Sequence, residues 1–381
     1  MSTPTANEQL SETELEPTPP EVKRYQREKL ILRILSVFAG LGVLVGFVFA
    51  MPILDDVLTL ILSENNWLRL LGTAILLGLV NELIALPIDF YSGYVLEHRY
   101  QLSTQTFRAW VWKRLKSYQV GGALGIPILL GLYALIWNTG SYWWLWTAGV
   151  WLLLTLVLGQ LLPILVLPVF YKLTPLEDAD LQARLEKLAA GTGLTLDGVF
   201  RWDLSKETRK ANAALTGLGR SRRVLLADTL LDSFTPDEIE VVFAHEVGHH
   251  VYKHLPKLIG WRVLTSLVGF WLVDVVLGFF YPNFSQRYDT LPILLLVLTL
   301  FGMALAPLQN VVSRIFERQC DRYALTRTGK KTAYKSAFVK LARLNKSDAE
   351  PHPVVVWFLH DHPPIRERIA MADAVLTDSG S

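Results

Sequence analysis

The run His245-Glu246-Val247-Gly248-His249 combines two imidazoles and a carboxylate at a spacing that can bind a metal ion and use it. On an α-helix, His245 and His249 are one turn apart, so both imidazoles leave from the same face, as two ligands of one tetrahedral zinc ion require. Glu246 lies beside them and can accept a proton from an attacking water molecule. The run therefore predicts one zinc ion per chain, with Glu246 as the catalytic base of a peptidase.

The residues before this run predict the helix that carries it. Thr235 is a suitable N-cap, Pro236 suits the first helical position, and Glu238 completes a capping box. Pro256 is expected to end the helix, which would then have about five turns.

Further histidines surround the motif. We expect His250 and His254 to lie away from the metal, because neither completes a second H-E-x-x-H pattern. The chain has eight histidines, so a chance occurrence of this short pattern is the competing interpretation. A third ligand elsewhere in the chain decides between the two.

The composition indicates a polytopic membrane protein. Of the 381 residues, 51% are hydrophobic and only 19% are charged, which does not suit a soluble globule. The apolar runs long enough, or nearly so, to cross a bilayer are 31–53, 67–88, 121–137, 142–171, 257–281 and 290–312. The predicted fold class is therefore mainly α: about six transmembrane helices plus a cytosolic α+β zinc metalloprotease domain of the gluzincin type.

The basic residues predict the orientation in the membrane. Five basic residues precede or open the first span: Lys23, Arg24, Arg27, Lys29 and Arg33. Between the end of this span and Arg69, all charged residues are acidic. The amino terminus, the segment 173–256 and the carboxyl-terminal part are then expected in the cytoplasm. The single cysteine, Cys320, excludes an internal disulfide and agrees with a reducing compartment. With a net charge of +2 and no aromatic-basic stripe, we expect no nucleic-acid partner.

The chain divides into five predicted parts. Residues 1–20 are polar, acidic and rich in Pro and Thr, which suits a disordered tail. The other parts are a four-span membrane domain (21–172), a first half of the protease domain (173–256), a transmembrane hairpin (257–312) and a second half of the protease domain (313–381).

The hairpin predicts where the third ligand lies. Its two spans return the chain to the same face of the membrane, so a helix continuing from the sixth span can meet the H-E-x-x-H helix. On that helix Glu317 and Asp321 are one turn apart. We expect Glu317 to be the third zinc ligand and Asp321 to hydrogen-bond a ligating imidazole. The alternative is a solvated helix face on which both carboxylates pair with neighbouring arginines.

A predicted β-hairpin precedes the zinc helix. Residues 211–215 and 223–227 read as its strands, with a turn at 217–221. An edge strand there could bind an extended peptide, with Asn212 as an additional amide contact. The alternative is a purely structural hairpin.

Taken together, these motifs resemble the type I CAAX prenyl protease group of integral-membrane zinc metalloproteases. The likeness rests on the H-E-V-G-H run, on the N-x-x-S-R-x-x-E-x-x-x-D segment 310–321, and on His362-Pro363 with Arg368. It extends to 94–106, 173–176 and 212–231, so it covers most of the chain and exceeds the likeness to the shorter heat-shock membrane proteases.

The resemblance implies roles for particular residues. It implies that His245, His249 and Glu317 bind zinc, that Glu246 is the catalytic base, and that His362 and Arg368 lie near the substrate or the developing oxyanion. Two features depart from the group: six spans where seven are usual, and Cys320 where a small residue is usual. Cys320 could be a thiolate ligand, but we interpret it as a small, partly buried helix residue.

Three functions remain open at this point. The first is cleavage near the carboxyl terminus of prenylated proteins, and the second is quality-control cleavage of membrane proteins. Both have a peptide or protein substrate and the lipid bilayer as partners. The third is a transporter or a scaffold with a vestigial site. This alternative would also explain the polar residues within the spans: Asn81, Glu82, Gln160 and Asp274.

Overall fold

The structure is a computed structural model that describes residues 16–217 and 222–375. The predicted disordered tail therefore lies outside the described residues up to residue 15, and the predicted turn at 217–221 lies outside them from residue 218. The described end of the tail is held against the carboxyl-terminal half of the chain, because the Thr18 hydroxyl donates to Asp348 Oδ1 at 2.9 Å.

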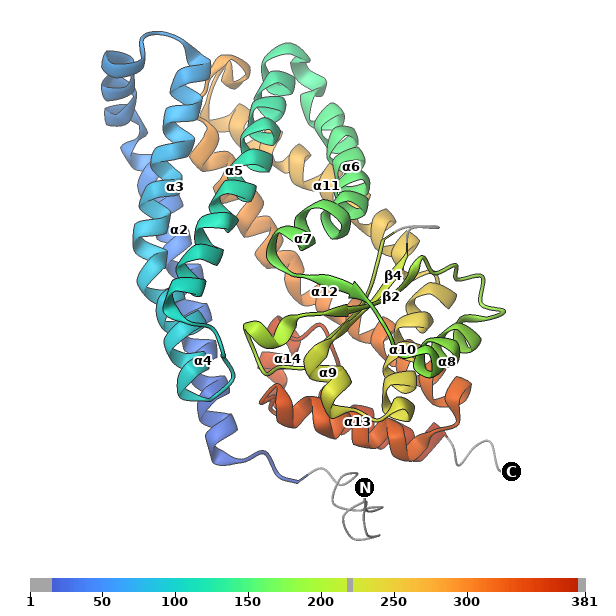
Figure 1. The fold of residues 1–381 in the computed structure, drawn as a ribbon. Helices are drawn as coiled ribbons and strands as arrows, with labels where there is room; N and C mark the ends of the chain where they lie inside the picture. The colour runs from blue at the N-terminus through green and yellow to red at the C-terminus, as the bar shows by residue number, and fades with distance from the viewer. Residues whose placement is uncertain (1–15, 218–221, 376–381) are drawn as a thin grey trace.

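Six helical stretches are long and apolar enough to cross a membrane, which confirms the predicted number (Figure 1). Large apolar side chains point away from the protein on them: Phe49, Leu60 and Phe279 are 79%, 87% and 80% exposed. Such side chains suit contact with lipid. The stretches are α2 (Pro20–Leu62), α3 (Asn66–Phe90) continued through a π-helical turn (Tyr91–Val95) and α4 (Leu96–Arg99), α5 (Phe107–Asn138), α6 (Trp143–Leu161) preceded by a 3-10 turn (Gly140–Tyr142) and continued through a π-helical turn (Leu162–Val166) and α7 (Leu167–Phe170), α11 (His254–Phe280) and α12 (Leu291–Thr328).

Carboxylates within these helices have partners inside the protein. Glu82 accepts from Arg114 Nε at 3.0 Å, and Asp274 Oδ1 accepts from the indole nitrogen of Trp143 at 2.6 Å. Ionisable groups in a membrane are expensive unless they are paired in this way. The two contacts tie α3 to α5 and α6 to α11, so these groups support helix packing.

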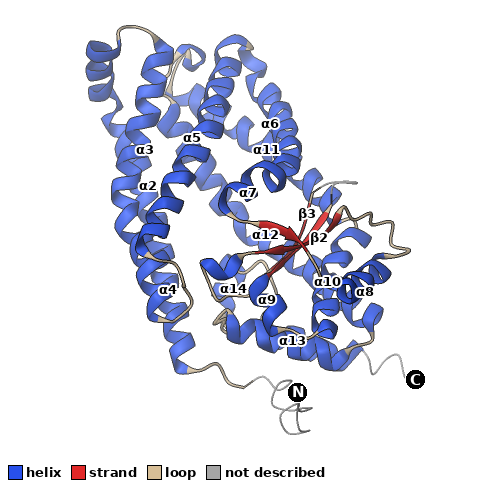
Figure 2. Cartoon of the chain, viewed as in Figure 1, coloured by secondary structure: helices blue, strands red, loops and turns tan. Residues whose placement is uncertain are grey.

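A small α+β domain lies at one end of the membrane helices (Figure 2). Its sheet has the order β1-β2-β4-β3, with β2 and β4 parallel and the other neighbours antiparallel. β3 is thus an edge strand, paired on one side only, with Ala213 opposite Leu226. The domain consists of β1 (Leu173–Pro175), α8 (Ala179–Ala189), β2 (Gly198–Trp202), a 3-10 turn (Leu204–Lys206), β3 (Ala213–Thr216), β4 (Arg223–Ala227), α9 (Asp228–Ser233), α10 (Pro236–Val251), α13 (Lys331–Leu344), α14 (Pro353–Leu359) and α15 (Ile365–Val375).

The membrane part and the domain are joined by one continuous helix. α12 has 38 residues, so it is about 57 Å long, and Pro307 within it does not interrupt it. Its first half packs with the membrane helices, and its second half lies against α10 with Ala324 and Leu325 in the domain core. The sequence prediction that the sixth span continues as a helix through Glu317 and Asp321 is confirmed.

The start of α10 is as predicted, and its end is not. The Thr235 hydroxyl accepts from the Glu238 backbone, and the Glu238 carboxylate accepts from the Thr235 backbone at 2.7 Å. The helix ends at Val251, however, because Lys253 takes a left-handed conformation with φ 54°. Pro256 does not end α10; it lies in the first turn of α11, where a proline costs no hydrogen bond.

Candidate active site

The candidate metal ligands come together where α10 crosses α12. His245 Nε2 lies 3.0 Å from Glu317 Oε2, and His249 Nε2 lies 3.3 Å from Glu317 Oε1. His245 and Glu317 are buried, with exposed fractions of 6% and 4%, whereas His249 is partly open. One carboxylate therefore faces both imidazoles of the H-E-x-x-H run.

Behind His245 lies a buried ion pair. The Asp321 carboxylate accepts from His245 Nδ1 at 2.9 Å, and Arg368 donates to the same carboxylate from Nε at 2.8 Å and from Nη2 at 2.5 Å. Because a carboxylate only accepts, the proton of a neutral His245 is on Nδ1 and its lone pair is on Nε2. Burial alone would lower the pKa of His245, but the neighbouring carboxylates of Asp321 and Glu317 raise that pKa to about 9. The carboxylates thus favour a positive charge at this position.

Behind His249 lies a second histidine. His249 Nδ1 is 3.1 Å from His254 Nδ1, and His254 Nε2 is 2.9 Å from Gln319 Oε1. With the amide oxygen as acceptor, His254 carries its proton on Nε2, so its Nδ1 accepts from His249 Nδ1. This leaves the lone pair of His249 on Nε2, toward Glu317. The sequence does not identify His254 and Gln319 as residues of the site, because neither belongs to the H-E-x-x-H pattern.

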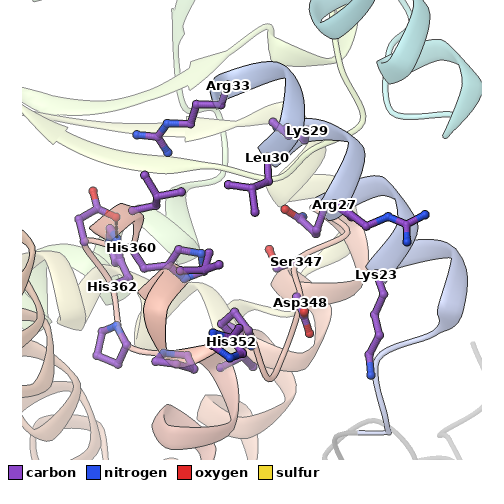
Figure 3. A pocket seen from close by; sticks show the side chains of 18 residues that line it. Lys23, Arg27, Lys29, Leu30, Arg33, Ser347, Asp348, His352, His360 and His362 are labelled. Atoms are coloured by element: carbon purple, nitrogen blue, oxygen red, sulfur yellow. Dashed lines mark hydrogen bonds and ion pairs between the residues drawn. The ribbon is translucent and has the colours of Figure 1, made fainter. Parts of the chain in front are cut away.

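His362 enters the site from the loop before α15, next to His360 (Figure 3). Its Nδ1 donates to Asp361 Oδ1 at 2.8 Å, and its Nε2 lies 3.3 Å from Glu317 Oε2. The hydrogen bond to Asp361 raises the pKa of His362 above that of an ordinary histidine. The side chain is 53% exposed, so it can reach a bound molecule.

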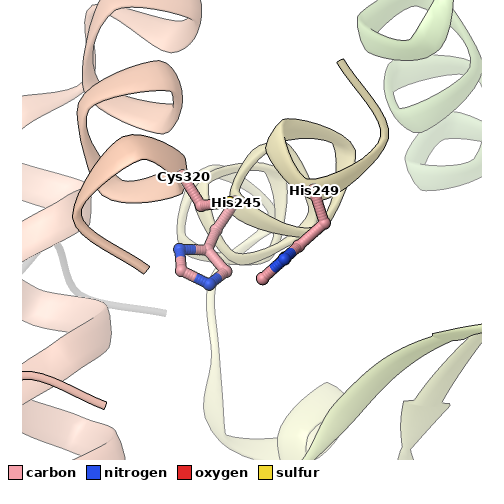
Figure 4. A group of neighbouring side chains, drawn as sticks. All are labelled: His245, His249 and Cys320. Carbon is pink, nitrogen blue, oxygen red and sulfur yellow. The ribbon is translucent and has the colours of Figure 1, made fainter. Parts of the chain in front are cut away.

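Cys320 also lies next to the two histidines (Figure 4). Donor atoms of His245, His249 and Cys320 lie within 4.8 Å of one another. The thiol, however, is 3.6 Å from His254 Nδ1, the nitrogen that faces His249 Nδ1, whereas Glu317 faces the Nε2 atoms. Cys320 also packs on Gly248, where an added Cβ would lie 3.0 Å from the Cys320 Cα. This contact explains why position 248 holds a glycine.

These residues fit a divalent metal ion. The Nε2 atoms of both imidazoles face the two oxygens of Glu317 at 3.0 and 3.3 Å, a spacing that a cation bound to all three side chains would fit. Within the described part of the chain, Glu317 Oε2 is buried and receives no hydrogen bond. Two histidines, one carboxylate and an open side are the ligand set of catalytic zinc sites.

Glu246 faces open space beside this cluster. It lines a cleft of about 360 Å³ together with His245, Arg368 and Asn212. No described residue hydrogen-bonds its carboxylate, so both of its oxygens are open to a molecule bound in the cleft. Asn212 is exposed, and its side chain lies just before β3 at the rim of the cleft. The edge of the sheet, the Glu246 carboxylate and the candidate ligand His245 therefore share one cleft.

The fold and the site together define a membrane-bound metallopeptidase. Known proteins agree with this class: the sequence profile of peptidase family M48 matches residues 175–376, and that of the CAAX prenyl protease N-terminal region, described as five membrane helices, matches residues 8–172. In the described residues 16–172 this chain has four membrane-length helices.

Similar proteins share most of their length with this chain. An uncharacterised metalloprotease of Bacillus subtilis, YhfN, is 30% identical over 81% of this chain and 74% of its own. CAAX prenyl protease 1 of Saccharomyces cerevisiae is 31% identical over 79% of this chain and 71% of its own. The crystal structure of S. mikatae Ste24p superposes with a TM-score of 0.83 at 25% identity, over 96% of this chain and 94% of that one.

The chain belongs to peptidase family M48. Within that family it is an integral-membrane metalloprotease of the CAAX prenyl protease 1 type, a multi-pass protein that uses a metal ion to hydrolyse peptide bonds. The resemblance seen in the sequence motifs is thereby confirmed.

Proposed function

We propose that this chain is a zinc endopeptidase that cleaves near the carboxyl terminus of prenylated, CAAX-type proteins. His245, His249 and Glu317 hold the zinc ion, and Glu246 is the catalytic base. The observation that carries the proposal is the Glu317 carboxylate, which faces the Nε2 atoms of both histidines at 3.0 and 3.3 Å. The name of the yeast relative, CAAX prenyl protease 1, supports the substrate class.

Each residue of the site has a distinct role in the proposed mechanism. Zinc, when bound, polarises the scissile carbonyl and acidifies water. Glu246 takes the proton of the attacking water and delivers it to the leaving amine. Asp321 fixes the tautomer of His245, and Arg368 fixes Asp321. His362, as an imidazolium whose Nδ1 donates to Asp361, donates from Nε2 to the oxyanion; the raised pKa of His362 favours this protonated form.

This assignment changes the role expected for Arg368. Its Nε and Nη2 both donate to Asp321, and its side chain is 6% exposed. An arginine held by two hydrogen bonds in this way is not free to turn and donate to an oxyanion. We therefore assign Arg368 a positioning role and leave oxyanion stabilisation to His362.

The substrate backbone is proposed to add to the sheet at β3. This strand pairs only with β4, and its amino-terminal end lines the cleft together with Glu246. A main-chain pairing of this kind tolerates many side chains, and Asn212 offers one further amide contact.

We also propose the predicted arrangement in the membrane. Residues 173–256 and 313–381 are the two halves of one cytoplasmic protease domain, joined by the transmembrane hairpin 257–312, and 21–172 is the amino-terminal membrane domain. Both termini are cytoplasmic. The basic residues around the first helix support this orientation, since they are typical of a cytoplasmic flank.

The experiment that tests the substrate class uses the detergent-purified protein and three substrates of equal length. These are a farnesylated CAAX peptide, the same peptide unmodified, and a helical membrane protein segment. We expect the highest kcat/KM for the farnesylated peptide and complete loss of cleavage after chelation of the metal. A preference for the unmodified membrane segment would instead support quality-control proteolysis and contradict the proposal.

A further inference from the structure

A basic cavity adjoins the catalytic cleft. It has a volume of about 520 Å³ and lies between α2 and the loops on either side of α14 (Figure 3). Lys23, Arg27, Lys29 and Arg33 line it from α2, and the opposite wall includes His360 and His362. Its only acidic lining residues in the described chain are Asp348 and Asp361, so cations are in excess.

Arg33 is the cation that points toward the active-site loop. Figure 3 shows its guanidinium directed from α2 toward His360, whereas the side chains of Arg27 and Lys23 extend away from it. Arg33 is close enough to His360 to affect it electrostatically. Burial lowers the pKa of His360, and the nearby charges of Arg314 and Arg33 lower this pKa further.

Arg33 has no anionic partner within the described residues, and neither have Lys23 and Arg27, whereas two other cations of α2 are paired. Arg24 pairs with Glu28 at 3.0 Å and Lys29 pairs with Glu97 at 3.5 Å. Arg33 stands instead among apolar residues at the beginning of a membrane helix. A basic residue at this place is expected on the cytoplasmic flank of a membrane helix, because such residues set the orientation of the helix in the membrane. That role does not require the side chain to point at the catalytic loop. Its direction indicates a place for an anion.

Glu246 lies between two cavities that are lined by different kinds of side chain. On one side Glu246 lines a partly apolar cavity of about 530 Å³, whose apolar wall includes Leu156 of α6 and Leu258 and Ile259 of α11. Four polar side chains also line this cavity: Arg222, His249, His250 and His254. On the other side it lines the polar cleft with His245. The basic cavity continues from the polar cleft, because Ser347, His362, Pro363 and Ile365 line both.

The edge strand gives this path a direction. Ala213, at the start of β3, lines the polar cleft, and Leu215 and Thr216, at its end, line the partly apolar cavity. A peptide added antiparallel to β3 therefore has its amino-terminal part at the partly apolar cavity and its carboxyl-terminal part toward the basic one.

We propose that the cavity around Arg33 binds the free α-carboxylate of the substrate. This inference rests on the proposed function, since it assigns the substrate's two ends to the two sides of Glu246. An extended peptide segment of three residues spans roughly 10 Å. His362 bridges that interval, as it lies 3.3 Å from Glu317 and also lines the basic cavity. The enzyme would then recognise substrates by a charged carboxyl terminus a few residues after the cleaved bond.

The test compares two peptides that differ only at their ends. One farnesylated peptide carries a free carboxyl terminus and the other a carboxamide, and kcat/KM is measured in detergent for wild type, Arg33→Gln and the control Arg24→Gln. Arg24 lies on the same helix outside the cavity and is exposed. We expect wild type and Arg24→Gln to prefer the free carboxylate about tenfold or more, since a charged hydrogen bond is lost with the amide. In Arg33→Gln this ratio should fall to about one.

Other outcomes overturn the inference in distinguishable ways. Equal cleavage of both peptides by wild type shows that the carboxylate is not recognised, while the proposed peptidase function stands. An equal loss on both peptides in Arg33→Gln shows a structural role for this arginine. An effect of Arg33→Gln that depends on anionic lipid in vesicles and not on the peptide end assigns the cavity to lipid headgroups. Cleavage of neither peptide by wild type contradicts the proposed function itself and the inference with it.

Discussion

Arg368 and Asp321 form a buried two-point ion pair directly behind the imidazole of His245. Nε lies 2.8 Å from Oδ2 and Nη2 lies 2.5 Å from Oδ1, and Asp321 Oδ1 is at the same time 2.9 Å from His245 Nδ1. The pair joins α15 to α12 and, through His245, to α10. The last helix of the chain therefore supports a candidate metal ligand that lies 123 residues before it.

Replacing Arg368 by methionine should weaken metal binding and stability together. Asp321 would be left buried without its guanidinium partner and with only His245 beside it, which costs about 3–5 kcal/mol of unfolding free energy. Loss of such an outer contact typically lowers metal affinity by about 10 to 100-fold. Competition with a chelator and thermal unfolding measure the two effects. The control is Arg366→Met, an exposed arginine of the same helix. Equal chelator resistance in both variants would contradict the role assigned to Arg368.

His254→Phe should weaken metal binding without disturbing the helix packing. Phenylalanine keeps the ring that stacks on Phe316 at 4.1 Å but lacks the nitrogen that holds His249 Nδ1. We expect a loss of metal affinity of about tenfold or more, measured by chelator competition. His250→Phe is the matched control, because His250 faces Arg222 and the Gly193 loop. If both variants retain metal as wild type does, His254 does not position His249.

Cys320→Ala distinguishes the two possible third ligands. Glu317 faces the Nε2 atoms, whereas the thiol lies on the side of His254. We therefore expect Cys320→Ala to keep one zinc ion per chain and a kcat/KM close to that of wild type. Loss of zinc in this variant, with retention in Glu317→Ala, would assign the site to the thiolate.

Gly248→Ala should push α10 and α12 apart. The added Cβ would lie 3.0 Å from the Cys320 Cα. Because Cα is a backbone atom, a change of side-chain rotamer cannot relieve this contact. We expect a loss of about 1–3 kcal/mol in unfolding free energy. The control is Gly260→Ala, where no atom lies within 4 Å of the added Cβ. Equal stability of the two variants would show that the helices tolerate a wider spacing.

The sequence predicts the elements around the site well where the local signal is strong. The capping box at Thr235 marks the start of α10, and the predicted hairpin strands 211–215 and 223–227 correspond to β3 (Ala213–Thr216) and β4 (Arg223–Ala227). The six apolar runs correspond to the six membrane-length helices. In each case a cap, a period or an apolar run of sufficient length decides the structure locally.

Features that depend on distant contacts are not predictable in this way. α10 ends at Val251, five residues before Pro256, because Lys253 is left-handed, although Pro256 is the stronger local signal. The contact of His249 with His254, and the position of Arg33 next to the active-site loop, arise from packing between separate elements. The expectation that Arg368 lies near the oxyanion came from the resemblance, and its partner Asp321 becomes clear only when α12 and α15 are placed together.

The measurement that tests the central claim most directly is zinc content together with peptide cleavage in wild type, Glu246→Gln and Glu317→Ala, all purified in detergent. Wild type should hold about one zinc ion per chain and cleave. Glu246→Gln should keep the zinc and lose cleavage, because the base is gone while the ligands remain. Glu317→Ala should lose both, since its carboxylate faces both histidines. A wild-type protein that binds no zinc, or a Glu317→Ala variant that keeps it, would contradict the account.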